Sequence, residues 1–381
     1  MHEPELFLDV SRLVWRRWTG RLPTGIDRVC LAYLDHYSQR ALAMVQRGSF
    51  RFLFKRQASR DLFSLLARPP RDFRRRLTAL LTRSILFERC EPSEGAIYLN
   101  VGHTGLNAPG LQDWLMDNHL KPVYMVHDLI PITHPQFCRE GEDVRHRHRM
   151  QTALKSAEGL IANSQATLDA TARFASAEGL DLPASVVAWL GCELPAKPTP
   201  PDNGKRPYFL SIGTLEGRKN HLMLLRLWQQ LVEDRGEQAP DLVLVGQRGW
   251  KADELFSILD RDEDLSDHVH ELSHCDDGQL VGLIDEAIAL LMPSKAEGFG
   301  IPVIETLARG TPVIASDLAV YRELVDGLPT YVDADDATEW KAAIVEALDG
   351  VGKARDPRLK GYRAPTWDQH FAKVDPFLAA L

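Results

Sequence analysis

The chain has 381 residues, which is long enough for two domains of ordinary size. Its formal net charge of −8 excludes a general nucleic-acid binder, because such a surface needs positive charge to displace counterions. The five cysteines include no Cys-x-x-Cys pair, so neither a disulfide framework nor a zinc site is expected. Residues 1–5 lack a signal-peptide pattern and no run of about 18 apolar residues occurs, so we expect a cytoplasmic protein.

The N-terminal part begins with a strand, a loop and a helix. Residues 5–10 are mostly apolar and predict a buried strand, and a helical pattern runs to about Tyr37. Thr24 or Gly25 can cap that helix, whose amides would then face the edge of the sheet. A loop that only turns the chain fits this segment equally well.

Residues 51–89 form a basic region, with eleven Arg or Lys against three Asp or Glu. Apolar residues recur in it at helical spacing, with arginines between them, which predicts an amphipathic basic helix over about 71–86. We favour a helix whose apolar stripe faces the core and whose charged face lies in solvent. Contact with an anionic membrane surface is the alternative.

Two further strands, 96–101 and 122–126, are each followed by a polar turn. The first turn contains His103, and the second contains His127 and Asp128. Open parallel sheets bind ligands outside the carboxyl ends of their strands, so these side chains are candidates for function. His127 can donate to an oxygen and titrate near neutrality; a purely structural loop histidine is the alternative.

Residues 197–207 are rich in proline and polar residues and predict a domain boundary. A second series begins with strand 208–212, and Asn220 is expected to cap its first helix. Arg218 and Lys219 stand at the start of that helix, where the helix dipole disfavours cations unless an anion binds. We therefore interpret this pair as a phosphate site rather than as surface charge.

Residues 293–312 predict a strand end, a tight turn and a helix that begins at Pro302. In the turn, Glu297-Gly-Phe-Gly300, glycine allows backbone amides to approach an anion at the positive end of the helix. Glu297 and Glu305 flank the turn and would repel a phosphate unless they bind hydroxyl groups. The acidic run 333–336 is interpreted as a helix cap rather than as a metal site.

Three motifs resemble, in order and spacing, the C-terminal domain of retaining GT-B glycosyltransferases of family 4, also called glycosyl transferases group 1. They are Gly-Thr-Leu-Glu-Gly-Arg-Lys-Asn-His at 213–221, Val-Gly-Gln-Arg-Gly-Trp at 245–250 and Pro-Ser-x-x-Glu-Gly-Phe-Gly-x-Pro-x-x-Glu at 293–305. The resemblance covers about 208–332, and fewer residues support it in the N-terminal half.

The resemblance implies an α/β protein with the GT-B fold, in which two Rossmann-like domains have parallel sheets facing across an interdomain cleft. The expected parts are an acceptor-binding domain at 1–197 with a basic insertion at 50–90, a linker at 198–207, a nucleotide-sugar domain at 208–365, and a helix at 366–381 that crosses back to the first domain.

The resemblance also implies roles for matched residues. Arg218 and Lys219 would hold the donor diphosphate and stabilise the leaving nucleotide, while Glu297 would bind sugar hydroxyls. His127 would bind the sugar from the first domain, and Glu305 would bind the ribose. The other expected donor-binding residues are Gly25, Gly213, Thr214, Ser273, His274, Gly298, Phe299 and Gly300. The expected acceptor-side residues are Arg28, His103 and Asp128.

The implied activity is a retaining hexosyltransferase that needs no metal or other cofactor. Its donor would be a nucleotide diphosphate sugar, with GDP-mannose favoured over UDP-sugars. Its acceptor would be a cell-surface glycan or a lipid-linked saccharide, reached at the inner face of the cytoplasmic membrane, with no nucleic acid involved. The alternatives are a GT-B epimerase or glucan synthase, and a catalytically silent GT-B module that binds a sugar nucleotide.

Overall fold

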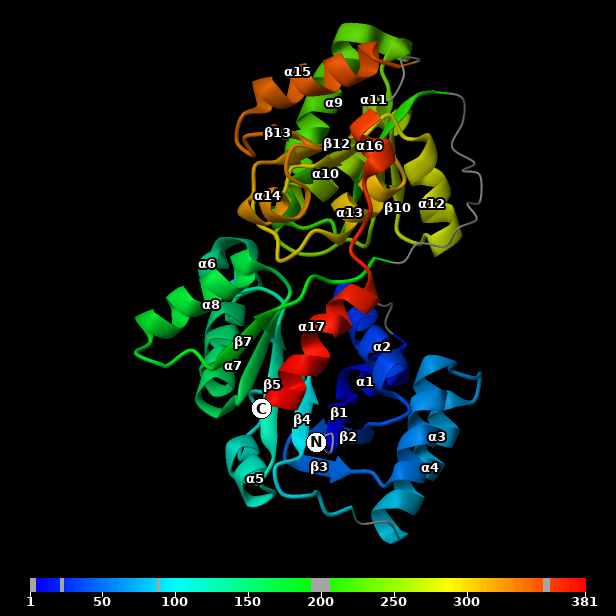
Figure 1. Cartoon of the computed structure of the whole chain (residues 1–381). Helices are drawn as coiled ribbons and strands as arrows, with labels where there is room; N and C mark the ends of the chain where they lie inside the picture. The colour runs from blue at the N-terminus through cyan, green and yellow to red at the C-terminus, as the bar shows by residue number, and fades with distance from the viewer. Residues whose placement is uncertain (1–4, 21–23, 88–89, 193–205, 352–356) are drawn as a thin grey trace. The chain divides into compact units, whose positions relative to one another are not determined.

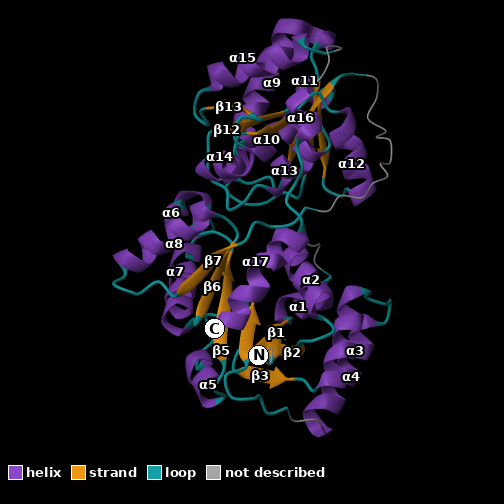
Figure 2. Cartoon of the chain, in the orientation of Figure 1, coloured by secondary structure: helices purple, strands orange, loops and turns teal. Residues whose placement is uncertain are grey.

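The computed structural model describes residues 5–20, 24–87, 90–192, 206–351 and 357–381. The chain divides into two compact units. The N-terminal unit comprises Met1–Leu129, Val144–Leu190 and Trp367–Leu381, and the C-terminal unit comprises Ile130–Asp143 and Gly191–Thr366. Figure 2 shows that each unit consists of one sheet with helices packed around it. The domain boundaries expected from the sequence stay predictions.

The N-terminal unit contains a seven-stranded sheet with the order β3-β2-β1-β4-β5-β6-β7. All neighbouring strands are parallel except β3, which pairs antiparallel to β2 at the sheet edge. The strands are β1 (Leu6–Asp9), β2 (Leu42–Arg47), β3 (Phe50–Leu53), β4 (Ile97–Asn100), β5 (Lys121–Val126), β6 (Gly159–Ala162) and β7 (Ala184–Val187). β1, β4 and β6 are buried along their whole length, as expected for parallel strands covered on both faces.

The helices of the N-terminal unit are α1 (Ser11–Thr19), α2 (Gly25–Tyr37), α3 (Arg56–Ala67), α4 (Phe73–Phe87), α5 (Leu111–Asp117), α7 (Glu142–Ser156), α8 (Gln165–Ala177) and α17 (Trp367–Ala380). Glu142 and Asp143 of α7 group with the other unit. The predicted basic helix is confirmed as α4. Ser164 caps α8, because its hydroxyl accepts from the Thr167 amide at 3.0 Å.

The last helix, α17, packs within the N-terminal unit through aromatic and polar contacts. The Tyr33 hydroxyl lies 2.7 Å from Nε2 of His370, and the Phe371 ring stacks on His36 at 3.7 Å between ring centroids. The Asp375 carboxylate accepts a 2.8 Å hydrogen bond from the Tyr37 hydroxyl. These contacts join the end of the chain to α2, which lies more than three hundred residues earlier.

The C-terminal unit contains a six-stranded, fully parallel sheet with the order β10-β9-β8-β11-β12-β13. Its strands are β8 (Tyr208–Ile212), β9 (Asp241–Val245), β10 (Val269–Leu272), β11 (Leu290–Met292), β12 (Val313–Ser316) and β13 (Thr330–Val332). Its helices are α6 (Ile130–Thr133), η1 (Pro135–Phe137), η2 (Gly217–Lys219), α9 (His221–Arg235), η3 (Gly236–Gln238), α10 (Asp253–Arg261), α11 (Glu263–Ser266), α12 (Asp277–Glu286), α13 (Ile301–Ala308), α14 (Ala319–Val325), α15 (Ala337–Asp349) and α16 (Pro357–Gly361).

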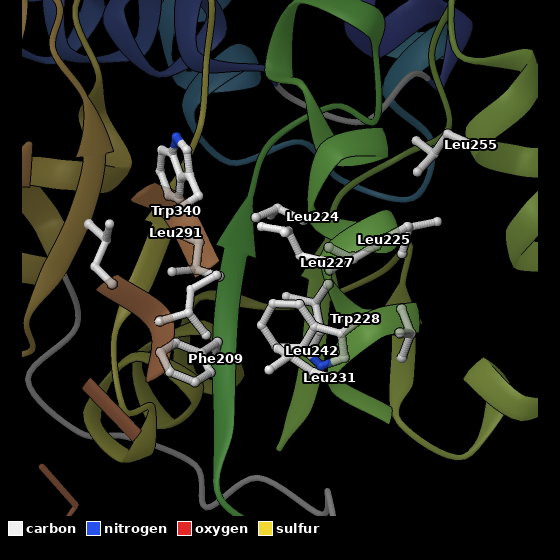
Figure 3. Close-up of a cluster of buried hydrophobic side chains, with 14 of the residues drawn as sticks. Phe209, Leu224, Leu225, Leu227, Trp228, Leu231, Leu242, Leu255, Leu291 and Trp340 are labelled. Carbon is white, nitrogen blue, oxygen red and sulfur yellow. The ribbon is translucent and has the colours of Figure 1, made fainter. Parts of the chain in front are cut away.

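The core of the C-terminal unit gathers leucines around three aromatic side chains (Figure 3). Phe209 on β8 packs edge-on against Trp228 on α9, with ring centroids 5.8 Å apart. Trp340 on α15 is completely buried. Both indole N–H groups have partners, since Trp228 donates to the Pro240 carbonyl at 2.8 Å and Trp340 to the Asp333 carbonyl at 3.0 Å.

Two local expectations concerned polar residues near helix starts. Asp336 caps α15, because its carboxylate accepts from the amides of Thr338 and Glu339. Asn220 occupies the N-cap position of α9 as expected, but the expected capping by its side chain was wrong. Asn220 precedes α9 at φ +58°, makes no side-chain cap bond, and donates from its side chain to the Ala334 carbonyl at 3.0 Å. Asn220 therefore ties the loop after β8 to the loop after β13.

Each sheet has a central point at which the strand order changes direction. In the N-terminal unit this point lies between β1 and β4, and in the C-terminal unit between β8 and β11. Loops that leave the carboxyl ends of two such strands diverge to opposite faces and leave a crevice in which α/β proteins bind ligands. The loops after β1, β4, β8 and β11 therefore border the expected ligand-binding crevices. Among the described residues, no helix combines the length and apolar character of a membrane span.

Candidate functional site

A buried charged cluster lies in the loops that follow β8 and β11. Lys219 Nζ donates to Glu297 Oε1 at 2.5 Å, and Arg218 Nη1 donates to Glu297 Oε2 at 2.9 Å. The exposed fractions of the three side chains are 17% for Arg218, 10% for Lys219 and 8% for Glu297. The structure therefore brings together three of the four predicted catalytic residues, as ion pairs.

Two residues that the sequence did not single out complete this cluster. Glu216 accepts from Arg218 Nη2 at 2.6 Å and from Nε at 3.0 Å. The Ser294 hydroxyl donates to Glu297 Oε1 at 2.7 Å. Glu216 lies inside the first motif, two residues before Arg218, so an acidic residue close to a cation pair was the available signal. Ser294 lies inside the third motif, three residues before Glu297, and its place in that motif was the available signal.

Backbone contacts join the two loops that carry the cluster. Arg218 Nη1 also donates to the Ala296 carbonyl at 2.5 Å, and the Lys295 amide donates to the Arg218 carbonyl at 2.9 Å. The guanidinium is thus held by the loop after β11 as well as by the Glu216 carboxylate in its own loop. Such contacts preorganise the charged groups before any ligand arrives.

Burial and charge act against each other on the pKa values of the cluster. Burial raises the pKa of Glu297, but the charges of Lys219 and Arg218 outweigh it and hold this pKa at about 2. Burial raises the pKa of Glu216, with Arg218 acting in the opposite direction. Burial lowers the pKa of Lys219, and Glu297 counteracts that effect. Glu297 is therefore a carboxylate at neutral pH.

Glycines make the loop after β8 compact enough to hold this cluster. Gly213 has φ +144°, and a Cβ there would lie 3.0 Å from Cε of Lys219. A Cβ on Gly246 would lie 1.9 Å from the Gly213 carbonyl oxygen, so the loop after β9 lies directly on the loop after β8. A Cβ on Gly249 would lie 2.7 Å from the Thr214 methyl group. Gly213 thus lies directly against Lys219, and Thr214 lies against the loop after β9.

The turn after β11 has the geometry expected from the sequence. Gly300 adopts φ +95° immediately before α13, and Pro302 lies in the first turn of that helix. A Cβ on Gly300 would lie 2.3 Å from Cε1 of Tyr321, so only glycine fits against that ring. Phe299 is buried and Gly298 is half-buried.

Glu305 and the pair Ser273–His274 are the remaining predicted donor-binding residues of the C-terminal unit. Glu305 is on α13 and is 1% exposed. Ser273 and His274 follow β10 at the edge of the sheet, are exposed, and lie 3.1 Å apart from Oγ to Nδ1. Strand β9 separates β10 from β8, so the charged cluster and the Ser273–His274 pair belong to different parts of the sheet edge.

The N-terminal unit brings His103 and His127 together at the ends of β4 and β5. Their ring centroids are 5.0 Å apart. His127 is buried, and its Nε2–H donates to the Val101 carbonyl at 2.7 Å, whereas His103, at φ +58°, contacts the Met125 carbonyl through Nε2. The backbone carbonyl of Asp128 lies 3.2 Å from Nε2 of His146. Burial lowers the pKa of both His103 and His127, so both are neutral at pH 7.

The first turn of α2 is held by a network of charged and polar groups. Asp27 accepts from the Thr24 amide at 2.7 Å and from the Thr24 hydroxyl at 2.8 Å. Arg12 Nε lies 2.6 Å and Arg16 Nε 3.1 Å from the same carboxylate. Gly25, the first residue of α2, is exposed. Arg28 in the same turn is half-buried.

A buried polar network at the central point of the N-terminal sheet was missed by sequence reasoning. Asp9, at the end of β1, accepts from Gln46 Nε2 and from the Tyr98 hydroxyl, each at 2.6 Å, and from the Ser11 amide at 2.8 Å. These hydrogen bonds lower the pKa of Asp9, but burial has the larger effect and raises it. An aspartate closing an otherwise apolar strand was the signal available in the sequence.

Comparison with solved structures identifies the fold of this protein. Anabaena Alr3699/HepE in complex with UDP matches with a TM-score of 0.67 and 18% identity, covering 99% of this chain and 100% of the other. Sucrose-phosphate synthase from Thermosynechococcus elongatus matches with a TM-score of 0.60 and 16% identity, covering 99% and 94%. The protein therefore has the GT-B fold, and the expected fold class is confirmed.

The sequence comparisons specify the family of the C-terminal half. Residues 196–363 match the family Glycosyl transferases group 1. Serotype-specific mannosyltransferase WbdA of Escherichia coli is 27% identical over 262 residues, which are 65% of this chain and 32% of WbdA. O-antigen chain mannosyltransferase RfbU of Salmonella typhimurium strain LT2 is 34% identical over 143 residues, which are 37% of this chain and 38% of RfbU.

The matched regions span about a third of the length of these curated relatives. Residues 196–363 are a Glycosyl transferases group 1 domain, and the chain is a GT-B protein similar to bacterial mannosyltransferases. The resemblance of the three motifs to glycosyl transferases group 1 is thereby confirmed for residues 196–363.

Proposed function

We propose that this protein transfers a hexose, with mannose favoured, from a nucleotide diphosphate sugar to a cell-surface glycan or a lipid-linked saccharide. The observation that carries the proposal is the buried Arg218–Lys219–Glu297 cluster at the central point of the C-terminal sheet. Two cations held beside a glycine-containing turn and a helix start suit a diphosphate. Mannose is favoured because WbdA and RfbU are mannosyltransferases.

In the proposed reaction, Arg218 and Lys219 stabilise the charge that develops on the departing diphosphate. The bond between the anomeric carbon and the diphosphate oxygen breaks, and a bond to the acceptor oxygen forms on the same face. The acceptor proton passes to a diphosphate oxygen. This sequence needs no protein nucleophile and retains the anomeric configuration.

Other residues bind the donor in this proposal. Glu297 exchanges its ion pairs for sugar hydroxyls as the diphosphate takes over the two cations. The amides of Gly298, Phe299 and Gly300 lie at the start of α13 and suit a phosphate or sugar oxygen. Glu305 binds the ribose, and Gly213, Thr214, Ser273 and His274 supply further donor contacts. No metal ion is required.

The N-terminal unit supplies the remaining groups. His127 is neutral at pH 7 and donates from Nε2 to the Val101 carbonyl, which orients its ring. We propose that it binds the transferred sugar, that Gly25 lies near the diphosphate, and that Arg28, His103 and Asp128 contact the acceptor. We also propose that the protein works in the cytoplasm, at the inner face of the cytoplasmic membrane.

A panel of GDP-, UDP- and dTDP-sugars tests the proposal by thermal stabilisation and by slow donor hydrolysis. A donor that binds the folded state raises the melting temperature, and we expect GDP-mannose to raise it most. UDP-sugars are the main competitors, because HepE was crystallised with UDP. The Lys219→Met variant should lose the stabilisation, whereas Lys341→Met, which removes a lysine paired with Asp234 at the surface, should keep it.

Three results would contradict the proposal. An inverted anomeric configuration in the first linkage formed, measured by proton NMR, would overturn retention. A new sugar isomer from nucleotide sugar alone would identify an epimerase. Nucleotide-sugar binding without transfer or hydrolysis would identify a catalytically silent module.

A further inference from the structure

Strand β1 lies between β2 and β4 in the middle of the N-terminal sheet, and it ends in Asp9, whose carboxylate is buried (Figure 1). The two carboxylate oxygens accept from different sides. Oδ1 accepts from the Ser11 amide at 2.8 Å, while Oδ2 accepts from Gln46 Nε2 and from the Tyr98 hydroxyl, each at 2.6 Å. An ionised carboxylate can only accept hydrogen bonds, so Asp9 obliges all three groups to donate towards it.

Two buried amide side chains carry this network to the loop that follows β4. Gln46 Nε2 donates to the Thr104 carbonyl at 3.0 Å, and Asn100 Nδ2 donates to the same carbonyl at 2.9 Å. A Cβ on Gly105 would lie 2.3 Å from Cδ of Gln46, so the loop packs directly on this amide. Because Asp9 and the Thr104 carbonyl both accept, Gln46 turns Nε2 towards them, and its buried Oε1 has no partner among the described residues. The carboxylate at position 9 therefore sets the direction of the Gln46 amide.

The loop held in this way carries His103 in an unfavourable backbone conformation. His103 has φ +58°, a left-handed value that is uncommon for residues with a side chain and persists where the surrounding contacts impose it. On one side of it, the Gly102 amide donates to Asn100 Oδ1 at 3.1 Å. On the other side, the Thr104 carbonyl accepts from both amide side chains. The buried network thus fixes the residues before and after His103.

The His103 ring presents a nitrogen that can accept a hydrogen bond. Its Nε2 contacts the Met125 carbonyl and carries the proton there, because a carbonyl only accepts. Burial lowers the pKa of His103, so the ring is neutral at pH 7 and its Nδ1 is unprotonated. The ring centroid lies 5.0 Å from that of His127. A hydroxyl group, which can donate to Nδ1, suits this position, whereas an ionised phosphate oxygen, which can only accept, does not.

We propose that Asp9 is a positioning residue of the acceptor site, which holds His103 where Nδ1 accepts from a hydroxyl of the saccharide. It acts through Gln46 and the loop 101–105. The inference rests on the proposed function and deepens it, because it names the group that His103 recognises and the buried residue that orients its ring. Asp9 is 3% exposed, so it acts through the loop and not by contact with a substrate.

Asp9→Asn tests the proposal with almost no change in shape. An amide has one accepting oxygen where the carboxylate has two, so it cannot serve the donors on both sides of Asp9. We expect the Gln46 amide to turn its Oε1 towards the new N–H group and to release the Thr104 carbonyl. Gln46→Met removes the same link from its other end, and it predicts the same effect on the loop even where Asp9→Asn prevents folding.

The first readout is NMR of the histidine rings in the whole protein without any sugar. The His103 signals, assigned with His103→Gln, should shift in Asp9→Asn and in Gln46→Met. Asp241→Asn is the matched control, because Asp241 is also a buried carboxylate but begins β9 in the C-terminal unit, and it should leave these signals in place. Unchanged His103 signals in both network variants would overturn the proposal.

The second readout is transfer from GDP-mannose to methyl α-mannoside. Asp9→Asn should raise the KM for methyl α-mannoside about ten-fold, as expected for roughly one lost hydrogen bond, and leave slow donor hydrolysis almost unchanged. In the presence of His103→Gln, Asp9→Asn should raise this KM no further. Equal losses of transfer and hydrolysis, or multiplied effects in the double variant, would show a general structural role and overturn the proposal. If the unaltered protein turns over no donor, the proposed function fails, and the ring signals alone decide whether Asp9 positions His103.

Discussion

The ammonium group of Lys219 donates to the carboxylate of Glu297 at 2.5 Å, although the two residues are 78 positions apart in the chain. Both side chains are almost completely buried, and Arg218 contacts the other carboxylate oxygen. In a buried pair of this kind, removal of one partner leaves a charge without compensation. The predicted donor site is therefore also part of what stabilises the C-terminal unit.

Lys219→Met should reduce both stability and transfer. We expect the free energy of unfolding to fall by about 3 kcal/mol, because Glu297 is left buried with Arg218 as its remaining cationic partner. The double variant Lys219→Met/Glu297→Gln should recover part of this loss while transfer stays abolished. Urea unfolding and a transfer assay measure the two effects. Purely additive losses in stability would show that the pair is not energetically coupled.

Acid should destabilise the protein partly through Glu297. Its pKa falls from 4.5 to about 2 in the folded protein, so its contribution to stability is present above about pH 4.5 and is lost as the pH falls towards 2. The loss is on the order of 3 kcal/mol. Unfolding free energies measured across this range should fall less steeply in Glu297→Gln than in the unaltered protein. Glu233→Gln, an exposed change on α9, should keep the full slope.

Gly300→Ala should cost considerably more than a comparable change elsewhere. The new Cβ would lie 2.3 Å from Tyr321 and the residue would keep φ +95°, so steric overlap adds to backbone strain. Gly327→Ala is the matched control, because Gly327 has φ +75° and nothing within 4 Å of the added carbon. We expect a loss of about 1 kcal/mol for Gly327→Ala and roughly 3 kcal/mol for Gly300→Ala. Equal melting temperatures for the two variants would contradict the steric argument.

Asp27→Ala should loosen the first turn of α2. The change leaves the partly buried Arg12 and Arg16 without this carboxylate and removes the acceptor for the Thr24 amide. We expect a loss of about 3 kcal/mol in unfolding free energy, whereas Asp35→Ala, at an exposed position of the same helix, should change it by less than about 0.5 kcal/mol. Faster hydrogen exchange confined to α2 would locate the effect.

Strong local signals made parts of the fold predictable. Strand β8 begins and ends where the sequence predicts, because an apolar run marks it. Helix α1 was not predicted, since it begins two residues after β1 and its arginines interrupt the apolar pattern. Strand β3 was missed because it is a short edge strand of four residues.

The candidate site was predictable only as a set of residues. The motifs placed Arg218, Lys219 and Glu297 in one region, but they did not reveal that Glu297 pairs with both cations or that Glu216 shares Arg218. These contacts depend on how the loop after β11 folds back onto the loop after β8. No local pattern encodes that distance, because it results from packing between distant segments.

The four charged residues Glu216, Arg218, Lys219 and Glu297 sum to a formal charge of zero. A neutral group of charges produces little field beyond its immediate surroundings, so it does not concentrate small anions from solution. An anion must instead fit closely enough to displace a carboxylate that is already in place. In the proposed function, this balance acts as a filter: abundant inorganic phosphate is a poor competitor, and a ligand that offers hydroxyls to Glu297 as well as a diphosphate to the cations has the advantage.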